Sequence, residues 1–237
     1  MKFTQNQKSE MQSYIFHGEN QPASRARLSE VIADARGRGL EVIQVDGANL
    51  KTEELLTQGR SQTLLGTGQL LVVENFFRNN RTAADTASAV VKNDDISFVF
   101  WEGKKLTPAT VKKLHSSFTI QEFKIPVAIF KFLDSLSPGN ARTTLGFLQQ
   151  ATGRDSSEFL LIMMARQVRL LFWAKIEPDT LKVAPWQKGN LVHQSEKFTK
   201  SQLITLHKKL LEIDRENKYS RLPENLTASL ELLTASL

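Results

Sequence analysis

The stretch from residue 14 to residue 28, YIFHGENQPASRARL, has the layout of a phosphate-binding turn. A short apolar run leads to a turn at Gly18, and a segment with helical spacing follows. A phosphate loop also needs a fixed pattern, which is Gly, four residues, Gly, Lys and then Ser or Thr. The backbone N–H groups of such a loop surround the phosphates, the lysine neutralises them, and the hydroxyl holds Mg²⁺.

This pattern fails at each position that it requires after Gly18. The second glycine would fall on Ala23, the lysine on Ser24 and the hydroxyl residue on Arg25. Arg25 and Arg27 could still meet an anion at the N-terminus of the helix. We favour a turn that only starts a helix over a nucleotide site.

Other catalytic and metal-binding patterns are equally sparse in this sequence. There is no Gly-x-Ser-x-Gly and no His-Glu-x-x-His motif. Asp94 and Asp95 precede an apolar run, and we favour the polar start of a strand over a metal site. Glu74 ends a buried run, and a strand-end carboxylate is favoured over a Mg²⁺ ligand. The histidines lie too far apart for a metal-binding spacing; they are His17, His115, His193 and His207. The sequence does not indicate an enzyme.

A segment rich in Gly, Ser and Thr, GRSQTLLGTGQ at residues 59–69, is expected to be an exposed loop or a frayed helix end. Leu64 and Leu65 are adjacent in it, flanked by Gln62 and Thr63, and neighbouring loop residues cannot both turn inward easily. Either one leucine closes the edge of the domain, or the pair forms an apolar wedge that enters a partner's pocket. The spacing alone leaves both interpretations open.

Strands alternate with helices in the first half, which predicts an α/β domain over residues 13–124 with a mostly parallel sheet covered on both sides. Residues 1–12 are expected to be a disordered lead-in. The expected strands are 13–17, 41–45, 69–74, 96–101 and 118–123. The expected helices between them are 23–36, 51–57 and 107–114.

The second half, residues 125–237, is expected to be all-helical, and the boundary falls near residues 123–126. The long helix over residues 156–175 is apolar around most of its circumference and is expected to be central and largely buried. The helix over residues 200–218 is expected to place Leu203, Leu206, Leu210, Leu211 and Ile213 on one side. The other expected helices are 127–136, 141–151, 186–194 and 223–237.

Composition narrows the class of protein further. The 237 residues include no cysteine, which excludes disulfides and thiolate zinc sites and suits a reducing cytoplasm. No apolar run reaches about 18 residues, so no membrane span is expected. The polar N-terminus lacks the apolar core of a signal peptide. The net charge of +6 suits an ordinary solvated surface and a nucleic-acid-facing patch equally well.

Taken in order, several motifs make the chain resemble the delta subunit family of the bacterial DNA polymerase III clamp loader. The first half carries YIFHGEN, VIQVDGANL and EELLTQGRSQTLLGTGQLLVVEN in the family's order. The second half carries FKFLDSL, then MMARQVRLLFWAK and finally LLEIDRENKYS. The resemblance covers residues 13–237, and it is the order and spacing of the motifs that make it specific.

The resemblance implies an AAA+-like first domain, RecA-like in its parallel sheet, whose phosphate loop is degenerate at Gly18, Ala23, Ser24 and Arg25. It implies no catalytic activity and no cofactor. The family binds the ring-shaped sliding clamp, the beta subunit, through an apolar wedge before the LLVVEN strand, and helps to open it. By position that wedge is Leu64 and Leu65. The second place is often aromatic in the family, so Leu65 is a departure.

The resemblance also implies that the helical domain joins a circular collar with the other loader subunits, gamma or tau and delta-prime. Arg166, Gln167 and Arg169 would lie in a collar helix, in structural or interfacial roles. Primed DNA is an indirect partner, a membrane is not, and the implied location is the cytoplasmic replisome. One departure is large: no residues remain for the family's small lid domain, so the chain resembles a shortened delta subunit.

Two rival functions stay open from the sequence. One is a nucleotide-dependent ATPase with an unusual phosphate loop, and the missing Gly-Lys-Ser/Thr pattern argues against it. The other is a basic DNA-binding accessory protein. Lys104, Lys105, Lys112 and Lys113 could face DNA, although a solvated helix face is slightly favoured.

Overall fold

The computed structural model describes residues 12–58, 68–78, 80–91, 96–152 and 157–237. The chain divides into two compact units, Met1–Ile125 and Pro126–Leu237. The first unit is α/β and the second is helical throughout its described residues. This agrees with the fold class expected from the sequence, in that an α/β unit with a parallel sheet followed by an all-helical part is confirmed.

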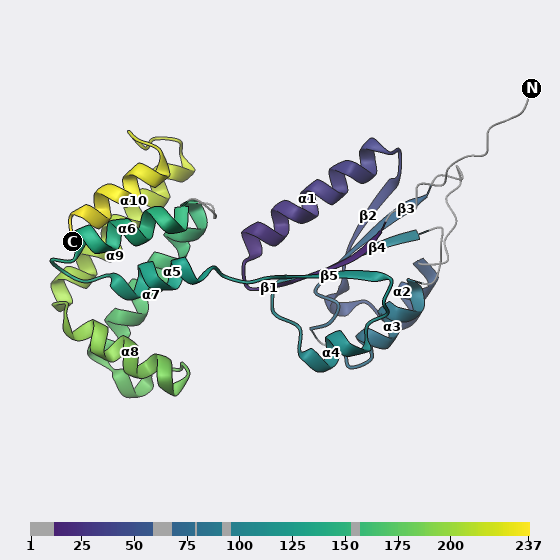
Figure 1. Cartoon of the computed structure of the whole chain (residues 1–237), viewed down its shortest axis with the longest axis horizontal. Helices are drawn as coiled ribbons and strands as arrows, with labels where there is room; N and C mark the ends of the chain where they lie inside the picture. Colours follow the sequence, from purple (N-terminus) through teal and green to yellow (C-terminus); the bar gives the residue numbers. More distant parts are fainter. Residues whose placement is uncertain (1–11, 59–67, 79, 92–95, 153–156) are drawn as a thin grey trace, which may run out of the picture. The chain divides into compact units, whose positions relative to one another are not determined.

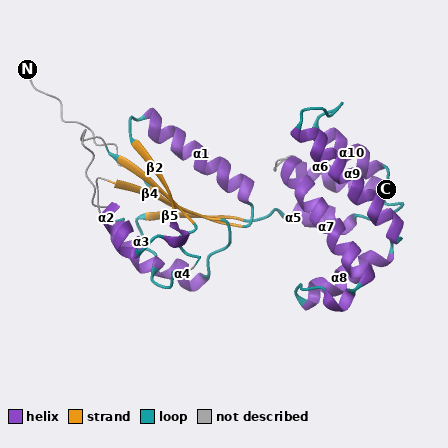
Figure 2. Cartoon of the chain, turned by 180° about the vertical axis from the view of Figure 1, so that it is seen from behind, coloured by secondary structure: helices purple, strands orange, loops and turns teal. Residues whose placement is uncertain are grey.

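The first unit is built on one five-stranded sheet in which every neighbouring pair is parallel. Its strand order is β2-β3-β4-β1-β5, so β1 lies between β4 and β5. Helix α1 covers one face, and α2, α3 and α4 cover the other (Figures 1 and 2). The strands are β1 Ser13–Gly18, β2 Glu41–Asp46, β3 Gln69–Glu74, β4 Ile96–Glu102 and β5 Phe118–Phe123. The helices are α1 Gln21–Gly37, α2 Thr52–Gln58, α3 Ala83–Val90 and α4 Pro108–Lys113, with a 3-10 turn at Gly47–Asn49.

Each face of the sheet has its own apolar core, because successive strand residues point to opposite sides. Ile15 lies in the core beneath α2, α3 and α4, while its neighbour Phe16 lies in the core beneath α1. Both are fully buried. Covering both faces explains why β3 and β4 consist mainly of apolar residues and show no regular polar alternation.

Helix α3 is the element that the sequence analysis missed. Its sequence, AADTASAV, consists mainly of small residues, so it lacks the large apolar side chains that mark a helical period. Ala83, Ala87 and Val90 are nevertheless buried against the sheet. Small side chains let the helix approach closely, and this packing outweighs the weak local signal.

The second unit is organised around α7, which contacts α5, α6, α8, α9 and α10. Its helices are α5 Val127–Ser135, α6 Ala141–Thr152, α7 Ser157–Ile176, α8 Pro185–Glu196, α9 Lys200–Lys218 and α10 Leu226–Ala235, with a 3-10 turn at Pro178–Thr180. The buried Gln194 of α8 donates its side-chain amide to the carbonyls of Leu133 and Leu136 at 2.8 and 3.0 Å. These bonds reinforce the C-terminal end of α5, where the Leu133 carbonyl also accepts the amide N–H of Leu136 at 3.4 Å.

Two expectations about the helical unit need correction. Helix α7 is central, yet it leaves Ile162, Trp173 and Ile176 exposed, so it is less buried than its composition suggests. Leu211 does not join the buried side of α9 and is 62% exposed, whereas Leu203, Leu206 and Leu210 are buried. Leu203, Leu206 and Leu210 follow one narrow stripe along α9. Leu211 lies about 100° further round the helix than Leu210 and therefore falls outside this stripe.

Candidate functional site

The carboxyl ends of the strands gather the polar residues of the first unit at one edge of the sheet. In open α/β sheets, ligands bind outside this edge, where the strand order reverses. That reversal occurs beside β1, whose next strand lies at the far end of the sheet. His17 of β1 is in register with Glu102 of β4 and with Glu122 of β5, and Glu74 ends β3. This edge is therefore the first candidate site of the unit.

The turn after β1 depends on glycine for a reason that involves β5. Gly18 has φ = 135°, a conformation that side chains rarely adopt, and a Cβ there would collide with the carbonyl of Phe123. In register, Gly18 pairs with Phe123 at the ends of β1 and β5. The need for glycine thus arises from close strand packing, without reference to a phosphate.

Five backbone amides of the turn are bonded to oxygens of the protein itself. Gly18 donates to the Lys104 carbonyl at 3.2 Å, Asn20 to the Phe123 carbonyl at 3.0 Å and Gln21 to the Glu19 carbonyl at 3.0 Å. The remaining two bonds both go to Asn20, whose side chain caps α1. They come from Ala23 at 3.3 Å to the side-chain oxygen and from Ser24 at 3.1 Å to the carbonyl. An incoming anion would have to displace these bonds.

The side chain of Arg25 is fixed by two neighbours. Its guanidinium forms a bidentate ion pair with Glu74, with N–O distances of 2.7 and 2.6 Å. Its Cζ also lies 3.6 Å from the centroid of the Trp101 ring, within cation–π range. The indole N–H of Trp101 in turn donates to the hydroxyl of Ser24 at 3.0 Å, and Ser24 is fully buried. Arg25, Glu74, Trp101 and Ser24 form the arginine cluster.

The arginine cluster occupies the positions that nucleotide chemistry would need. Arg25 stands where the sequence pattern requires a hydroxyl for Mg²⁺, and Glu74 is the strand-end carboxylate that could have held the same ion. In this chain a guanidinium joins the two positions directly. Because the Arg25 side chain is 43% exposed, the pair contributes only modestly to stability.

Glu102 is the most perturbed titratable group at the edge. It is 4% exposed, and burial raises its pKa to about 7. The amide of Phe77 donates to its Oε1 at 2.7 Å, which opposes the shift together with the charge of Arg78. The sequence analysis did not single out Glu102, although an acidic residue directly after the apolar run ISFVFW was a usable signal.

His17 is also buried at this edge, and burial lowers its pKa. Its Nδ1 accepts the amide N–H of Leu106 at 3.3 Å. Nearby, Lys105 donates to Glu122 at 2.9 Å and holds the pKa of that carboxyl below its ordinary value. Among the residues that the structure describes, no group of three or more His, Cys, Asp or Glu side chains could hold a metal ion.

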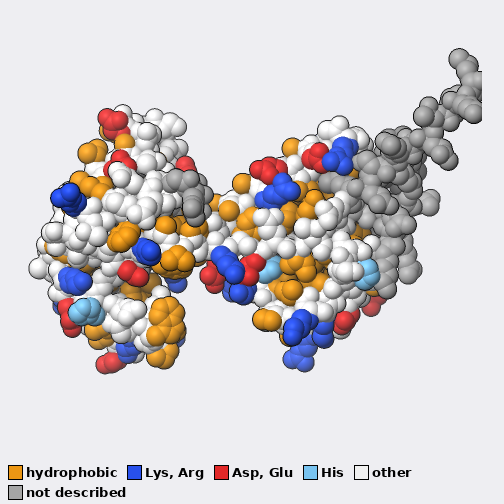
Figure 3. Space-filling model, viewed as in Figure 1, with side chains coloured by type: hydrophobic (Ala, Val, Ile, Leu, Met, Phe, Trp, Pro, Cys, Tyr) orange, Lys and Arg blue, Asp and Glu red, His pale blue; other side chains and the backbone are white. Residues whose placement is uncertain are grey.

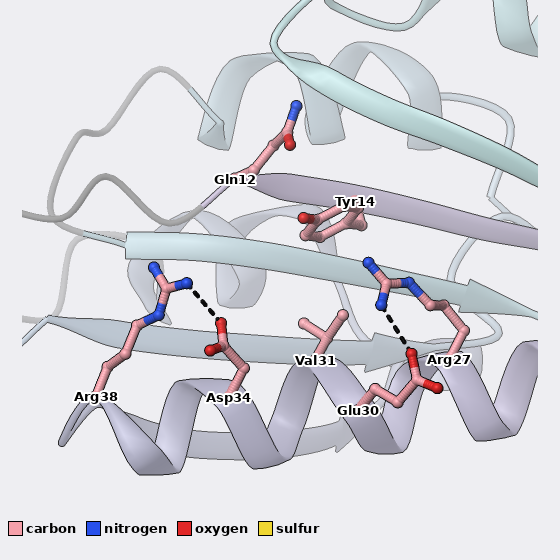
Figure 4. A pocket seen from close by; sticks show the side chains of 7 residues that line it. All are labelled: Gln12, Tyr14, Arg27, Glu30, Val31, Asp34 and Arg38. Carbon is pink, nitrogen blue, oxygen red and sulfur yellow. Dashed lines mark hydrogen bonds and ion pairs between the residues drawn. The ribbon is translucent and has the colours of Figure 1, made fainter.

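A polar pocket of about 290 Å³ lies on the α1 side of the sheet (Figure 4). Arg27 pairs with Glu30 at 2.8 Å, and Arg38 pairs with Asp34 at 2.9 Å, so both guanidinium groups at the pocket have a carboxylate partner. Arg27, which could have met an anion, is directed to Glu30 instead. The residues that line this pocket are Gln12, Tyr14, Arg27, Glu30, Val31, Asp34 and Arg38.

The proposed clamp-binding wedge lies outside the described residues. Leu64 and Leu65, with Gln62 and Thr63, fall between the end of α2 at Gln58 and the start of β3 at Gln69. The structure therefore fixes the two elements that flank this segment.

The three residues that were expected to lie in a collar helix are on α7 but not in one cluster. Arg166 and Arg169 are exposed, whereas Gln167 donates to the side-chain oxygen of Gln194 at 2.8 Å. Since Gln194 also holds the end of α5, Gln167 supports the interior of the unit. Arg169 borders an apolar groove between α7 and α9.

Charged side chains of both signs are spread over the face of each unit that Figure 3 shows, with apolar side chains between them. At the strand edge, Lys105 pairs with Glu122, and Lys124 lies 3.7 Å from the same carboxylate. Part of the basic charge there is thus neutralised. Among the described residues, no helix is long and apolar enough to cross a membrane.

Comparison with known proteins gives structural likeness only. No family model and no curated protein matches the sequence. The DNA clamp loader delta protein of Bacillus subtilis is 12% identical, with 94% of each chain covered and a TM-score of 0.46. A DNA polymerase III gamma subunit-related protein of Thermotoga maritima is 15% identical, with 96% of this chain and 94% of that one covered and a TM-score of 0.35. A clamp loader delta protein, the kind of protein that the sequence motifs resemble, is thus among these structures. Likeness at such TM-scores carries no inference about function.

Proposed function

We propose that this chain is a non-catalytic, delta-type subunit of a bacterial DNA polymerase III clamp loader. The order of the sequence motifs supports this assignment. The arginine cluster is the observation that carries it, since a guanidinium joins the two positions where a nucleotide-binding domain would hold Mg²⁺. The five bonded amides of the turn support it further. The degenerate phosphate loop is then a retained scaffold, and ATP hydrolysis belongs to other subunits.

In this proposal the first unit binds the sliding clamp through Leu64 and Leu65. Binding opens the ring only if the wedge favours the open clamp over the closed one, because a ligand shifts an equilibrium by its differential affinity. A leucine in place of an aromatic residue at position 65 buries less area and loses on the order of 1 kcal/mol. Opening of the clamp would then depend more on contacts made by Leu64 and by the flanking residues.

The second unit is proposed to join the collar of the loader, with Arg166 and Arg169 exposed on α7 for contact with neighbouring subunits. Only Lys124, Ile125 and Pro126 separate β5 from α5, which leaves no room for a lid domain. Contacts that a lid would make with other subunits must be absent or made elsewhere. The proposed location is the cytoplasmic replisome, with primed DNA as an indirect partner.

Clamp binding by the full chain tests this function. The purified protein and the sliding clamp from the same source are mixed, and their affinity is measured by surface plasmon resonance. Leu64→Ala/Leu65→Ala should abolish binding, while Leu211→Ala, which truncates an exposed leucine of the helical unit, should leave it unchanged. Failure of the wild-type chain to bind would refute the function, and normal binding by the double variant would refute the site.

A fluorescent ATP titration separates this proposal from the rival ATPase. The bonded turn amides and the arginine cluster predict no tight Mg²⁺-dependent binding to the isolated chain. Tight binding would favour the ATPase. Steeply salt-dependent DNA binding by the isolated chain would instead favour the DNA-binding accessory protein.

A further inference from the structure

An apolar groove of about 520 Å³ lies on the helical unit between α7 and α9. Val168 and Leu203, both fully buried, belong to its lining. Trp173, Ile176 and Ile204 line it while remaining 44%, 43% and 42% exposed. Large apolar side chains that are left half in water around a concavity mark a binding surface more often than isolated exposed ones do.

The groove has a defined shape because its largest side chain is anchored. The indole N–H of Trp173 donates to the hydroxyl of Thr180 at 2.7 Å, and that hydroxyl donates to the carbonyl of Glu177 at 3.0 Å. The ring therefore stands in a fixed orientation against the 3-10 turn after α7. A preformed wall of this kind lowers the conformational entropy lost on binding.

Basic residues dominate the rim. Arg169 of α7 and His207 and Lys208 of α9 line the groove with Phe172, and Glu177 is the one acidic residue among its lining residues. Within the described part of the chain, neither Arg169 nor Lys208 forms an ion pair, so both charges are available to a partner. The α9 side presents Ile204 and Lys208 one turn apart, as one helix face does.

We propose that this groove binds an acidic amphipathic helix of another protein. Apolar side chains at i, i+3 or i+4 and i+7 would enter between α7 and α9, in the manner of helix-in-groove recognition. Carboxylates beside that apolar stripe would meet Arg169 and Lys208. A second copy of this chain fits less well, because two-fold pairing of this surface with itself would bring the two basic rims together.

This inference goes beyond clamp binding and does not depend on it, because it rests on the helical unit alone. Arg169 belongs both to this rim and to the expected collar helix. A loader subunit that carries an acidic amphipathic helix would therefore be one partner of the required chemistry.

Two synthetic fluorescent peptides test the inference on the full-length chain. Both are helical and share one leucine stripe, but the positions that flank it carry glutamate in one peptide and lysine in the other. Fluorescence anisotropy measures binding, and a Trp186→Phe background leaves Trp173 as the exposed tryptophan that reports contact. We expect the glutamate peptide to bind, to shift the emission of Trp173, and to bind more weakly as salt increases.

A matched pair of substitutions tests the location. Ile204→Glu places a charge in the groove, whereas Ile162→Glu alters another exposed isoleucine, on α7, that does not line it. We expect Ile204→Glu to lower the affinity for the glutamate peptide at least about tenfold, and Ile162→Glu to leave this affinity unchanged. Arg169→Ala/Lys208→Ala keeps the apolar surface and should lower the affinity for the glutamate peptide by about three- to tenfold.

Four outcomes would overturn the proposal. Equal binding of the glutamate and lysine peptides, or insensitivity to both Ile204→Glu and Arg169→Ala/Lys208→Ala, would show nonspecific adsorption. Absence of binding by both peptides would show that the groove does not accept such a helix. Self-association of the wild-type chain that Ile204→Glu abolishes would identify a second copy as the occupant. Clamp affinity, measured in parallel, keeps failure here distinct from failure of the proposed function.

Discussion

Glu102→Gln should have little effect on stability at or below about pH 4.5 and should stabilise the first unit increasingly as the pH rises to about 7 and above. Burial raises the pKa of Glu102 from its ordinary value of 4.5 to about 7. A difference of this size corresponds to about 3 kcal/mol between the two protonation states. Glutamine keeps an oxygen that can accept the Phe77 amide but cannot ionise, so it avoids the cost of a buried charge.

The direction of the pH dependence follows from proton linkage. Between pH 4.5 and about 7 the folded protein holds a proton on Glu102 that the unfolded chain has released. Glu102 therefore contributes its full stability below pH 4.5, and that contribution is lost as the pH rises through about 7. The advantage of Glu102→Gln should grow across this window and approach about 3 kcal/mol near pH 8.

Urea unfolding of the full chain can isolate this effect. In a Trp173→Phe/Trp186→Phe background, Trp101 is the remaining one of three tryptophans and reports on the first unit. The free energy of unfolding is measured with and without Glu102→Gln from pH 5 to about 8.5. His17 is present in both proteins, so its own titration largely cancels in the difference. A difference that stays constant across this range would refute a buried, proton-binding Glu102.

Three further substitutions test the packing of both units by the same unfolding measurement. Arg25→Ala should lower the free energy of unfolding by about 1 kcal/mol at low salt, because it removes the half-exposed pair with Glu74 and the contact with Trp101. Arg25→Lys should recover part of this loss, and no loss for Arg25→Ala at low salt would contradict the cluster. Gly18→Ala should cost more than about 2 kcal/mol, because φ = 135° and the Phe123 carbonyl exclude a Cβ; a neutral result would mean that the turn adapts. Gln194→Ala should cost about 2 kcal/mol in the helical unit, since it removes the buried side-chain donor to the Leu133 and Leu136 carbonyls, and a change below about 0.5 kcal/mol would show that water replaces the amide.

The strands could be predicted from the sequence because burial on both faces leaves a local signature. The run QLLVVE has no polar alternation, and β3 begins and ends at the expected residues, Gln69 and Glu74. Helix α3 lacked such a signature, since its alanines contribute through close approach to the sheet. Leu211 was wrongly expected on the buried side of α9, because the apolar stripe in the sequence is wider than the stripe that packing buries.

At the candidate site, the sequence alone could predict only the absence of the phosphate-loop residues. Counting from Gly18 shows that the required glycine, lysine and hydroxyl are missing, and this needs no structure. What replaced them depends on the fold, because Arg25 and Glu74 are far apart in sequence and meet only when β3 is placed beside β4 and β4 beside β1. The burial of Glu102 likewise depends on segments that are distant in the chain, such as the Phe77 amide.

The structure also indicates why single substitutions would not create a phosphate loop. A lysine at position 24 would replace a fully buried serine and remove the acceptor of the Trp101 indole N–H. A hydroxyl residue at position 25 would free Glu74 but also expose the face of Trp101 that Arg25 covers. Each change towards nucleotide binding thus costs stability before a ligand can compensate. The turn keeps its shape through Gly18 and its bonded amides, without a phosphate.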